Sequence, residues 1–195
     1  NEPIAPHIAR HAPKMIRTSW GRPGEDAVGL WVMIAGLVLF LGVHTLTTQR
    51  DLRGRMVASL GDGTYKILYS LASAVGLALI VWGFAKYRAT GWIDVWTPPS
   101  AMRHLTAALM LPAVILVVAS YIRGRIYTTL KHPMLTGVKL WAAAHLLANG
   151  DLGSIILFGS FLAWAVFDRI SLKRRSGAGG VRIPRGGAAH HTIWD

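Results

Sequence analysis

The residues of this sequence best suited to chemistry are four histidines in or beside long apolar segments: His44, His104, His132 and His145. The other four of the eight histidines lie in the polar ends of the chain and need no special explanation. An imidazole at membrane depth is costly and is a functional candidate by default, although a single one can simply link two helices by a hydrogen bond. Four of them in one chain therefore direct attention to a bound cofactor or metal.

Among the groups that imidazoles bind, haem b requires the fewest further ligands from this sequence. Zinc takes three or four protein ligands, but the chain has no cysteine, these four histidines form no His-x-x-x-His or His-Glu-x-x-His pair, and the carboxylate nearest to them in the sequence is Asp151. A proton relay needs acidic residues inside the apolar segments, and none precedes Asp168 there. Haem needs one or two neutral imidazoles from facing helices and room for a flat ring. We therefore expect haem b, with His145 as the first candidate ligand.

The neighbours of His145 are compatible with such a ring. Trp141 lies one turn earlier on nearly the same helix face, and small residues surround the histidine at Ala142, Ala143, Ala144 and Ala148. Small residues either leave a slot for a macrocycle or let two helices approach closely, and both interpretations stay open. Lys139 either extends to the membrane interface or pairs with a haem propionate.

Depth limits which histidines can share one iron. His132 and His145 are 13 residues apart on one predicted helix, which is about 20 Å of rise and roughly 220° of rotation. The expected topology places His104 and His145 toward one face of the membrane and His44 and His132 toward the other, so depth alone favours these two pairs. His132 precedes Pro133, which suits a first helical turn, and it either contacts a cofactor or starts the helix.

Five apolar segments must position these histidines, over residues 28–46, 67–84, 105–121, 134–147 and 152–167. Crossing a bilayer takes about 20 apolar residues, with a range of about 17–25, so the last two segments need residues from their flanks. With 52% hydrophobic and only 15% charged residues, the chain is neither an ordinary soluble protein nor a disordered one. We predict an all-α, polytopic transmembrane bundle of about five spans.

Basic residues predict the orientation of these spans. The chain has a formal net charge of +12, and 13 basic residues follow the first, third and fifth spans, against 7 on the other side. The positive-inside rule then places the N-terminus outside and the C-terminus in the cytoplasm. Because these residues lie in short loops between apolar segments, we do not expect a nucleic acid partner.

The polar ends divide the chain into three parts. Residues 1–27 are predicted to form an irregular polar arm, residues 28–172 the transmembrane domain, and residues 173–195 a flexible, basic and glycine-rich tail. Four tryptophans near the predicted span ends are expected to lie at the membrane interfaces: Trp31, Trp92, Trp96 and Trp164.

Five stretches of the chain form a recognisable set. They are Leu-Phe-Leu-Gly-Val-His at 39–44, Tyr-Ser-Leu at 69–71, Arg-His-Leu at 103–105, the long run 131–151, and Leu-Phe-Gly-Ser-Phe-Leu-Ala-Trp at 157–164. Together they resemble the NnrU family of bacterial membrane proteins. The resemblance covers about residues 33–175. It implies a multi-pass protein of the bacterial inner membrane and, from the association of the family with nitrite and nitric oxide reductase genes, an accessory role in denitrification.

The plant zeta-carotene isomerases resemble the same family and are membrane haem b proteins with histidine ligands. Their equivalents of His44, His132 and His145 fall on matching motifs, and the comparison favours His44 and His145 as axial ligands. This pair conflicts with the depth argument, which leaves His104 as the geometric alternative. A cysteine that the isomerases carry three residues before the last histidine is Ala142 here, so a cysteine-based ligand switch is excluded.

The resemblance therefore implies a haem b-binding inner-membrane protein with an accessory redox role, with the lipid bilayer, haem and other membrane subunits as expected partners. One alternative is a membrane enzyme, either a haem-dependent polyene isomerase or an S-adenosylmethionine-dependent methyltransferase. Membrane methyltransferases of the isoprenylcysteine and methanethiol types share a His-Pro-x-x-x-Gly stretch, here residues 132–137, but their downstream acidic and aromatic cluster is represented only by Asp168 and Arg169. Another alternative is a non-catalytic subunit whose histidines only form hydrogen bonds.

Overall fold

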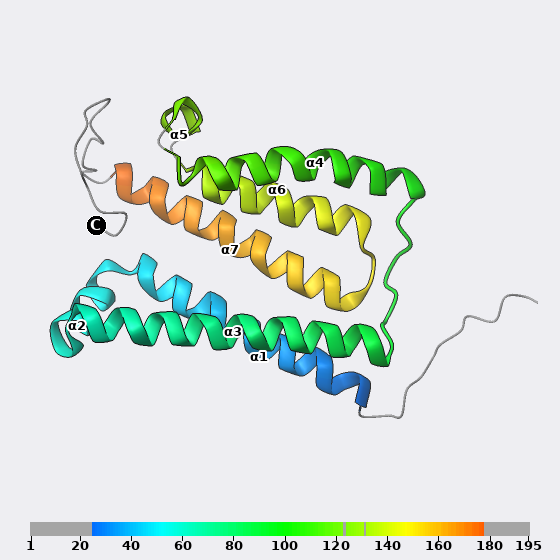
Figure 1. Ribbon diagram of the computed structural model, residues 1–195, viewed down its shortest axis with the longest axis horizontal. Helices are drawn as coiled ribbons and strands as arrows, with labels where there is room; N and C mark the ends of the chain where they lie inside the picture. Colours follow the sequence, from blue (N-terminus) through cyan, green and yellow to red (C-terminus); the bar gives the residue numbers. More distant parts are fainter. Residues whose placement is uncertain (1–24, 123, 131, 178–195) are drawn as a thin grey trace, which may run out of the picture.

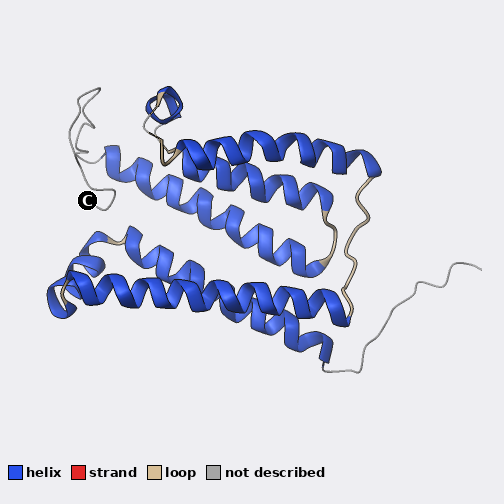
Figure 2. Cartoon of the chain, in the orientation of Figure 1, coloured by secondary structure: helices blue, strands red, loops and turns tan. Residues whose placement is uncertain are grey.

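The computed structural model describes residues 25–122, 124–130 and 132–177, which fold into seven helices (Figure 1). These are α1 (Glu25–Thr48), α2 (Arg50–Leu60), α3 (Asp62–Thr90), α4 (Ser100–Ala119), α5 (Arg125–Leu130), α6 (Pro133–Ala148) and α7 (Leu152–Gly177). The described ranges contain no strand, only one isolated bridge between Asp94 and Asp151 (Figure 2). The predicted all-α class is therefore confirmed.

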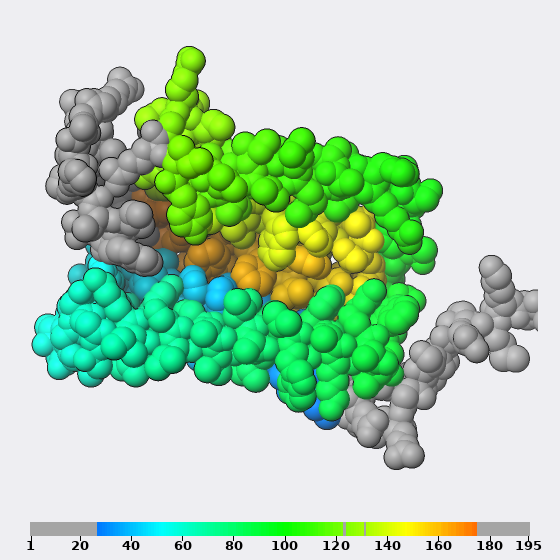
Figure 3. Space-filling model, in the orientation of Figure 1, coloured from blue at the N-terminus to red at the C-terminus, as the bar shows by residue number. Residues whose placement is uncertain are grey.

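The five long helices pack in the order α3, α1, α7, α6, α4, which differs from their order in the sequence. Helix α7 lies in the middle and packs against both α1 and α6. The short helices α2 and α5 lie at one end of the bundle, and loops 91–99 and 149–151 lie at the other (Figure 1). Helices α3 and α4 form the two edges, and in Figure 3 the yellow and orange atoms of α6 and α7 are recessed between them.

Helices α1 and α3 pack so closely that their backbones touch. The contact uses four glycines, Gly29 and Gly36 on α1 and Gly76 and Gly83 on α3. A Cβ atom added at Gly36 would lie 2.7 Å from the Ile80 amide nitrogen and 2.8 Å from the Gly76 carbonyl oxygen. Both glycine pairs are seven residues apart, which places their members on one helix face. Small residues that bring backbones together are typical of helix packing in membranes.

A narrow apolar core joins four of the long helices. Its buried members are Met33 and Leu37 on α1, Ile80 on α3, Ala142 on α6, and Leu157 and Phe158 on α7. Outside this core, large apolar side chains remain exposed, including Val38 at 70%, Leu111 at 67% and Trp31 at 66%. Soluble proteins rarely expose apolar surface of this extent. The exposed faces are suited to contact with a lipid bilayer.

Helices α1, α3, α4 and α7 are long and apolar enough to cross a membrane, which indicates a multi-pass membrane protein. Helix α6 has 16 residues and is about 24 Å long, short of a hydrocarbon core of about 30 Å. The five predicted segments thus correspond to five helices, of which four meet the length of a span. The orientation of the chain in the membrane stays a prediction.

The boundaries of the ends differ from the prediction. Helix α1 begins at Glu25, so residues 25–27 are helical rather than part of an irregular arm, because acidic residues favour a first helical turn. Helix α7 continues to Gly177, through the first residues assigned to the tail, because Lys and Arg side chains are good helix formers. The remaining parts of the predicted arm and tail, residues 1–24 and 178–195, lie outside the described residues.

Candidate functional site

His44 on α1 and His145 on α6 are held in the same way. The Nδ1 atom of His44 lies 2.7 Å from the Phe40 carbonyl oxygen, and that of His145 lies 3.0 Å from the Trp141 carbonyl oxygen. A carbonyl can only accept, so Nδ1 donates in both cases. Each bond ties the imidazole to its own helix, four residues back, and leaves the Nε2 lone pair available. Both side chains are half-buried.

A continuous layer of aromatic rings connects the two histidines. The contacts, given as distances between ring centroids, are His145–Phe158 at 4.4 Å, Phe158–Trp141 at 5.1 Å, Trp141–Phe161 at 5.5 Å, Phe161–Phe40 at 5.9 Å and Phe40–His44 at 4.2 Å. The rings come from α1, α6 and α7. The structure therefore brings His44 and His145 to the two ends of one apolar layer.

The two histidines meet α7 at different depths. His145 stacks on Phe158, whereas His44 lies 5.9 Å from the ring of Trp164. Six residues of helix separate these two positions, which is about 9 Å. This offset is smaller than the roughly 20 Å of helix between His132 and His145. The sequence argument expected His44 to share the depth of His132 and to lie away from the depth of His145. These offsets do not support that grouping.

His104 lies on the outer side of α4. Its side chain is exposed. Two residues later on the same helix, the Thr106 hydroxyl donates to the Ala144 carbonyl oxygen at 2.8 Å, so the α6-facing side of α4 presents Thr106. Two residues correspond to a rotation of about 200°, which turns His104 away from α6. The geometric alternative, His104 with His145, is thus not brought together in this structure.

The other predicted site residues lie along α6. His132 occupies the N-cap position without a capping hydrogen bond from its side chain, and Pro133 stands in the first turn as predicted. Lys139 lies in the middle of the helix and is half-buried. In the part of the chain that the structure describes, the Lys139 ammonium makes no ion pair.

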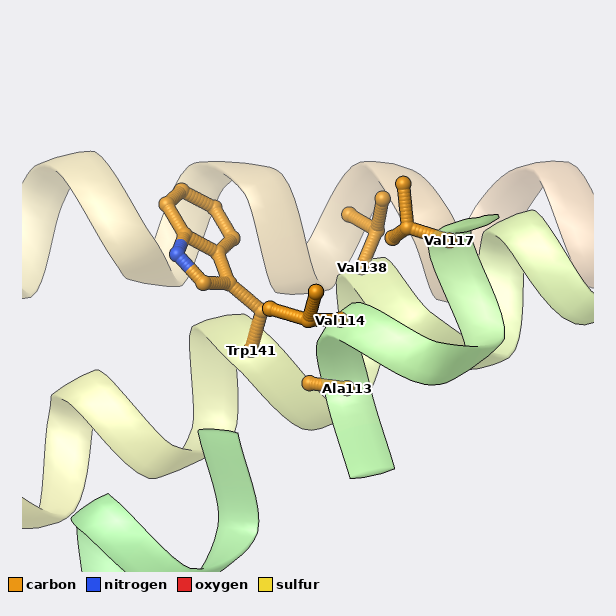
Figure 4. Close-up of a pocket in the computed structure, with 5 residues that line it drawn as sticks. All are labelled: Ala113, Val114, Val117, Val138 and Trp141. Carbon is orange, nitrogen blue, oxygen red and sulfur yellow. The ribbon is translucent and has the colours of Figure 1, made fainter. Parts of the chain in front are cut away.

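Trp141 also borders a recess between α4 and α6. Figure 4 shows its indole beside four aliphatic side chains, Val138 of the same helix and Ala113, Val114 and Val117 of α4. The volume of the recess is about 260 Å³ and its lining is almost entirely apolar. One face of Trp141 therefore belongs to the aromatic layer, and the residue also meets a space open to an apolar ligand or lipid.

Glycine 137, which ends the His-Pro-x-x-x-Gly stretch, has a packing role. A Cβ atom at Gly137 would lie 2.9 Å from the Ala113 carbonyl oxygen and 2.9 Å from Cγ2 of Val117 on α4. The backbone of α6 thus approaches α4 as closely as α1 approaches α3. Helix packing alone explains this glycine, so the motif carries little weight as a sign of S-adenosylmethionine binding.

A polar network closes the end of the bundle nearest His145. The buried Asp151 carboxylate accepts from the Ser154 amide at 2.9 Å and the Ser154 hydroxyl at 2.8 Å, and pairs with Arg88 at 3.0 Å. The Tyr87 hydroxyl accepts from the amides of Ile93 and Gly153, each at 3.1 Å. Asp151 therefore caps the first turn of α7 and ties this helix to α3.

Sequence reasoning missed the aromatic partners of the histidines. Phe158, Phe161 and Trp164 follow one another at intervals of three residues, which places them along one side of a helix, and this spacing is a signal that could have identified the layer. Sequence reasoning also placed Trp164 near the end of a span and hence at a membrane interface, whereas Trp164 lies in the middle of α7.

Among the described residues, no group of three or more His, Cys, Asp or Glu side chains could hold a metal ion.

Comparison with known proteins gives one match. The family described as NnrU protein matches residues 32–194, which is most of the chain. No curated protein and no solved structure matches it.

Proposed function

This chain belongs to the NnrU family, and we propose that it is a bacterial inner-membrane protein that binds haem b through His44 and His145 and has an accessory redox role in denitrification. The observation that carries the proposal is the matched state of the two imidazoles. Each places Nδ1 against a backbone carbonyl, and in the neutral tautomer that donates this bond, Nε2 carries the lone pair that a metal ion would bind. Metal-bound histidines are commonly oriented by such a bond on the other ring nitrogen.

The surroundings of the two histidines suit a flat apolar ring. Phe40, Phe158 and Phe161 supply aromatic faces between them, and Ala142, which is fully buried, adds little bulk. Haem supplies a one-electron couple whose potential depends on its axial ligands and on the polarity around it.

The remaining candidates have supporting places in this proposal. Lys139 is half-buried without an ion pair among the described residues, which makes it a candidate partner for a haem propionate. Trp141 joins the aromatic layer directly. His132, at the first turn of α6, is a second candidate for a propionate contact. His104 is exposed and serves as a control.

The test is an absorption spectrum of the full chain, expressed with ample haem and purified in detergent, before and after reduction with dithionite. We expect a Soret band, sharp α and β bands on reduction, and b-type haem in the pyridine haemochrome assay. His44→Ala and His145→Ala should each abolish the two-histidine spectrum. His104→Ala, a histidine of the same bundle, should leave it unchanged.

Two results would count against the proposal. A folded wild-type chain that stays colourless even with added haemin would remove haem altogether. Full haem content in the His44→Ala, His145→Ala double variant would reassign the ligands, and His132→Ala and His104→Ala would then show where. The accessory role is measured separately, as nitrite and nitric oxide consumption by deletion cells that carry either the wild-type chain or His145→Ala. Equal consumption by both cells would refute that role.

A further inference from the structure

One buried donor beside His44, the Trp164 indole nitrogen on α7, has no hydrogen-bond partner among the residues that the structure describes. The Ser73 hydroxyl on α3 is also enclosed, and its neighbour is the Tyr69 hydroxyl one turn earlier. The hydrocarbon region of a bilayer offers no water to satisfy such groups. A partner supplied from outside the chain would remove this cost.

These groups converge on one place. The Tyr69 ring lies 5.5 Å from the His44 ring, and the Trp164 ring lies 5.9 Å from it at an interplanar angle of 88°. Ser73 stands one turn after Tyr69, on the same side of α3. Three helices, α1, α3 and α7, thus bring an imidazole, an indole, a phenol and a hydroxyl together in an otherwise apolar region.

The chemistry of the cluster selects a neutral acceptor. An indole N–H can only donate, and hydroxyl groups can donate as well. His44 already gives its Nδ1 proton to Phe40. The donors of the cluster, an indole, a phenol and a hydroxyl, carry no charge, and burying an anion without a charged partner is costly. A neutral oxygen therefore fits the donors better than an anionic one.

The position of the cluster selects a ligand that is soluble in lipid. Tyr69 is half-buried, and its neighbours Leu68 and Leu71 are exposed on the apolar face of α3 at 49% and 58%. A molecule that reaches Tyr69 from this side comes from the bilayer. We propose that the cluster of Tyr69, Ser73 and Trp164 binds a lipid-soluble molecule with neutral carbonyl oxygens, of the quinone class. This binding is independent of whether His44 also binds iron.

The experiment titrates the full chain in detergent with decylubiquinone, a short-chain quinone, and follows tryptophan fluorescence and the heat of binding. Trp164→Phe keeps the aromatic packing and removes the N–H, and Ser73→Ala removes the hydroxyl. We expect each variant to weaken binding by roughly 3–10-fold, the range for one hydrogen bond. Trp31→Phe, at a tryptophan that is 66% exposed, should bind like the wild type.

A stability measurement separates a binding role from a structural one. Because the Trp164 N–H has no partner among the described residues, Trp164→Phe should leave the Tm of the free chain unchanged or raised. Equal quinone affinity of wild type and both variants would overturn the proposal. A loss of haem absorption in Trp164→Phe with unchanged quinone binding would also overturn it, because the donor would then serve haem. If the wild-type chain shows no Soret band but still binds quinone in a Trp164-dependent manner, the haem proposal fails and the quinone proposal stands.

Discussion

The close contact of α1 with α3 gives a prediction whose size follows from the structure. In Gly36→Ala the new Cβ atom would lie 2.7 Å from the Ile80 amide nitrogen, 0.7 Å short of the 3.4 Å at which ordinary contact begins. The obstructing atoms belong to the backbone, so no side chain can turn aside, and the two helices must separate. Overpacking of this kind costs about 1–3 kcal/mol. For a chain of this size we expect Tm to fall by roughly 3–10 °C.

The assay follows intrinsic tryptophan fluorescence while the detergent-purified chain is heated. Gly42→Ala is the matched control, because it makes the same chemical change on the same helix and its Cβ atom would have nothing within 4 Å. Alanine is the better helix former by up to about 1 kcal/mol, so Gly42→Ala should be neutral or stabilising. If the two variants melt at the same temperature, the close backbone contact between α1 and α3 is refuted.

Two further predictions use the same heating assay. Asp151→Ala removes the acceptor that caps α7 and pairs with α3, and it should lower the free energy of unfolding by about 1–3 kcal/mol. Asp94→Ala, at an exposed loop residue, should change it by no more than about 0.5 kcal/mol. If the two variants melt at the same temperature, the capping role is contradicted. Thr106→Val leaves the Ala144 carbonyl without its cross-helix donor and should lower the free energy of unfolding by about 0.5–1.5 kcal/mol. Thr128→Val, at an exposed threonine, should have little effect. A larger loss of stability in Thr128→Val than in Thr106→Val would be evidence against the link between α4 and α6.

Hydropathy predicted the helices well, because a chain in a bilayer must satisfy its backbone groups within each apolar segment. The same pattern cannot predict which helices touch. Gly29, Gly36, Gly76 and Gly83 become meaningful only when α1 and α3 are placed side by side in antiparallel register. The apolar pattern of a segment stops at its first charged residues. The sequence analysis therefore missed the continuation of α7 to Gly177 and placed Trp164, which lies in the middle of this helix, near the end of a span.

For the candidate site, the residue types were informative and their depths were not. Depth was counted from assumed span ends, and it separated His44 from His145. The structure shows that helices from different parts of the chain bring the two within reach of one aromatic layer. The assignment of this pair as metal ligands, which the family resemblance favours, stays a prediction. The enclosure of the Trp164 indole nitrogen without a partner among the described residues depends on how the helices pack, which no sequence pattern reports.

The central place of α7 has a consequence for biogenesis. The ribosome delivers α1 and α3 first and then α4 and α6, and each pair can form a hairpin of its own in the membrane, since α1 packs on α3 and α4 packs on α6. The helix that lies between the two hairpins is synthesised last. Until α7 emerges and inserts, the rings of Phe158, Phe161 and Trp164 are absent from the bundle, and His44 and His145 belong to separate hairpins. Maturation of the site is therefore a late, post-insertion event.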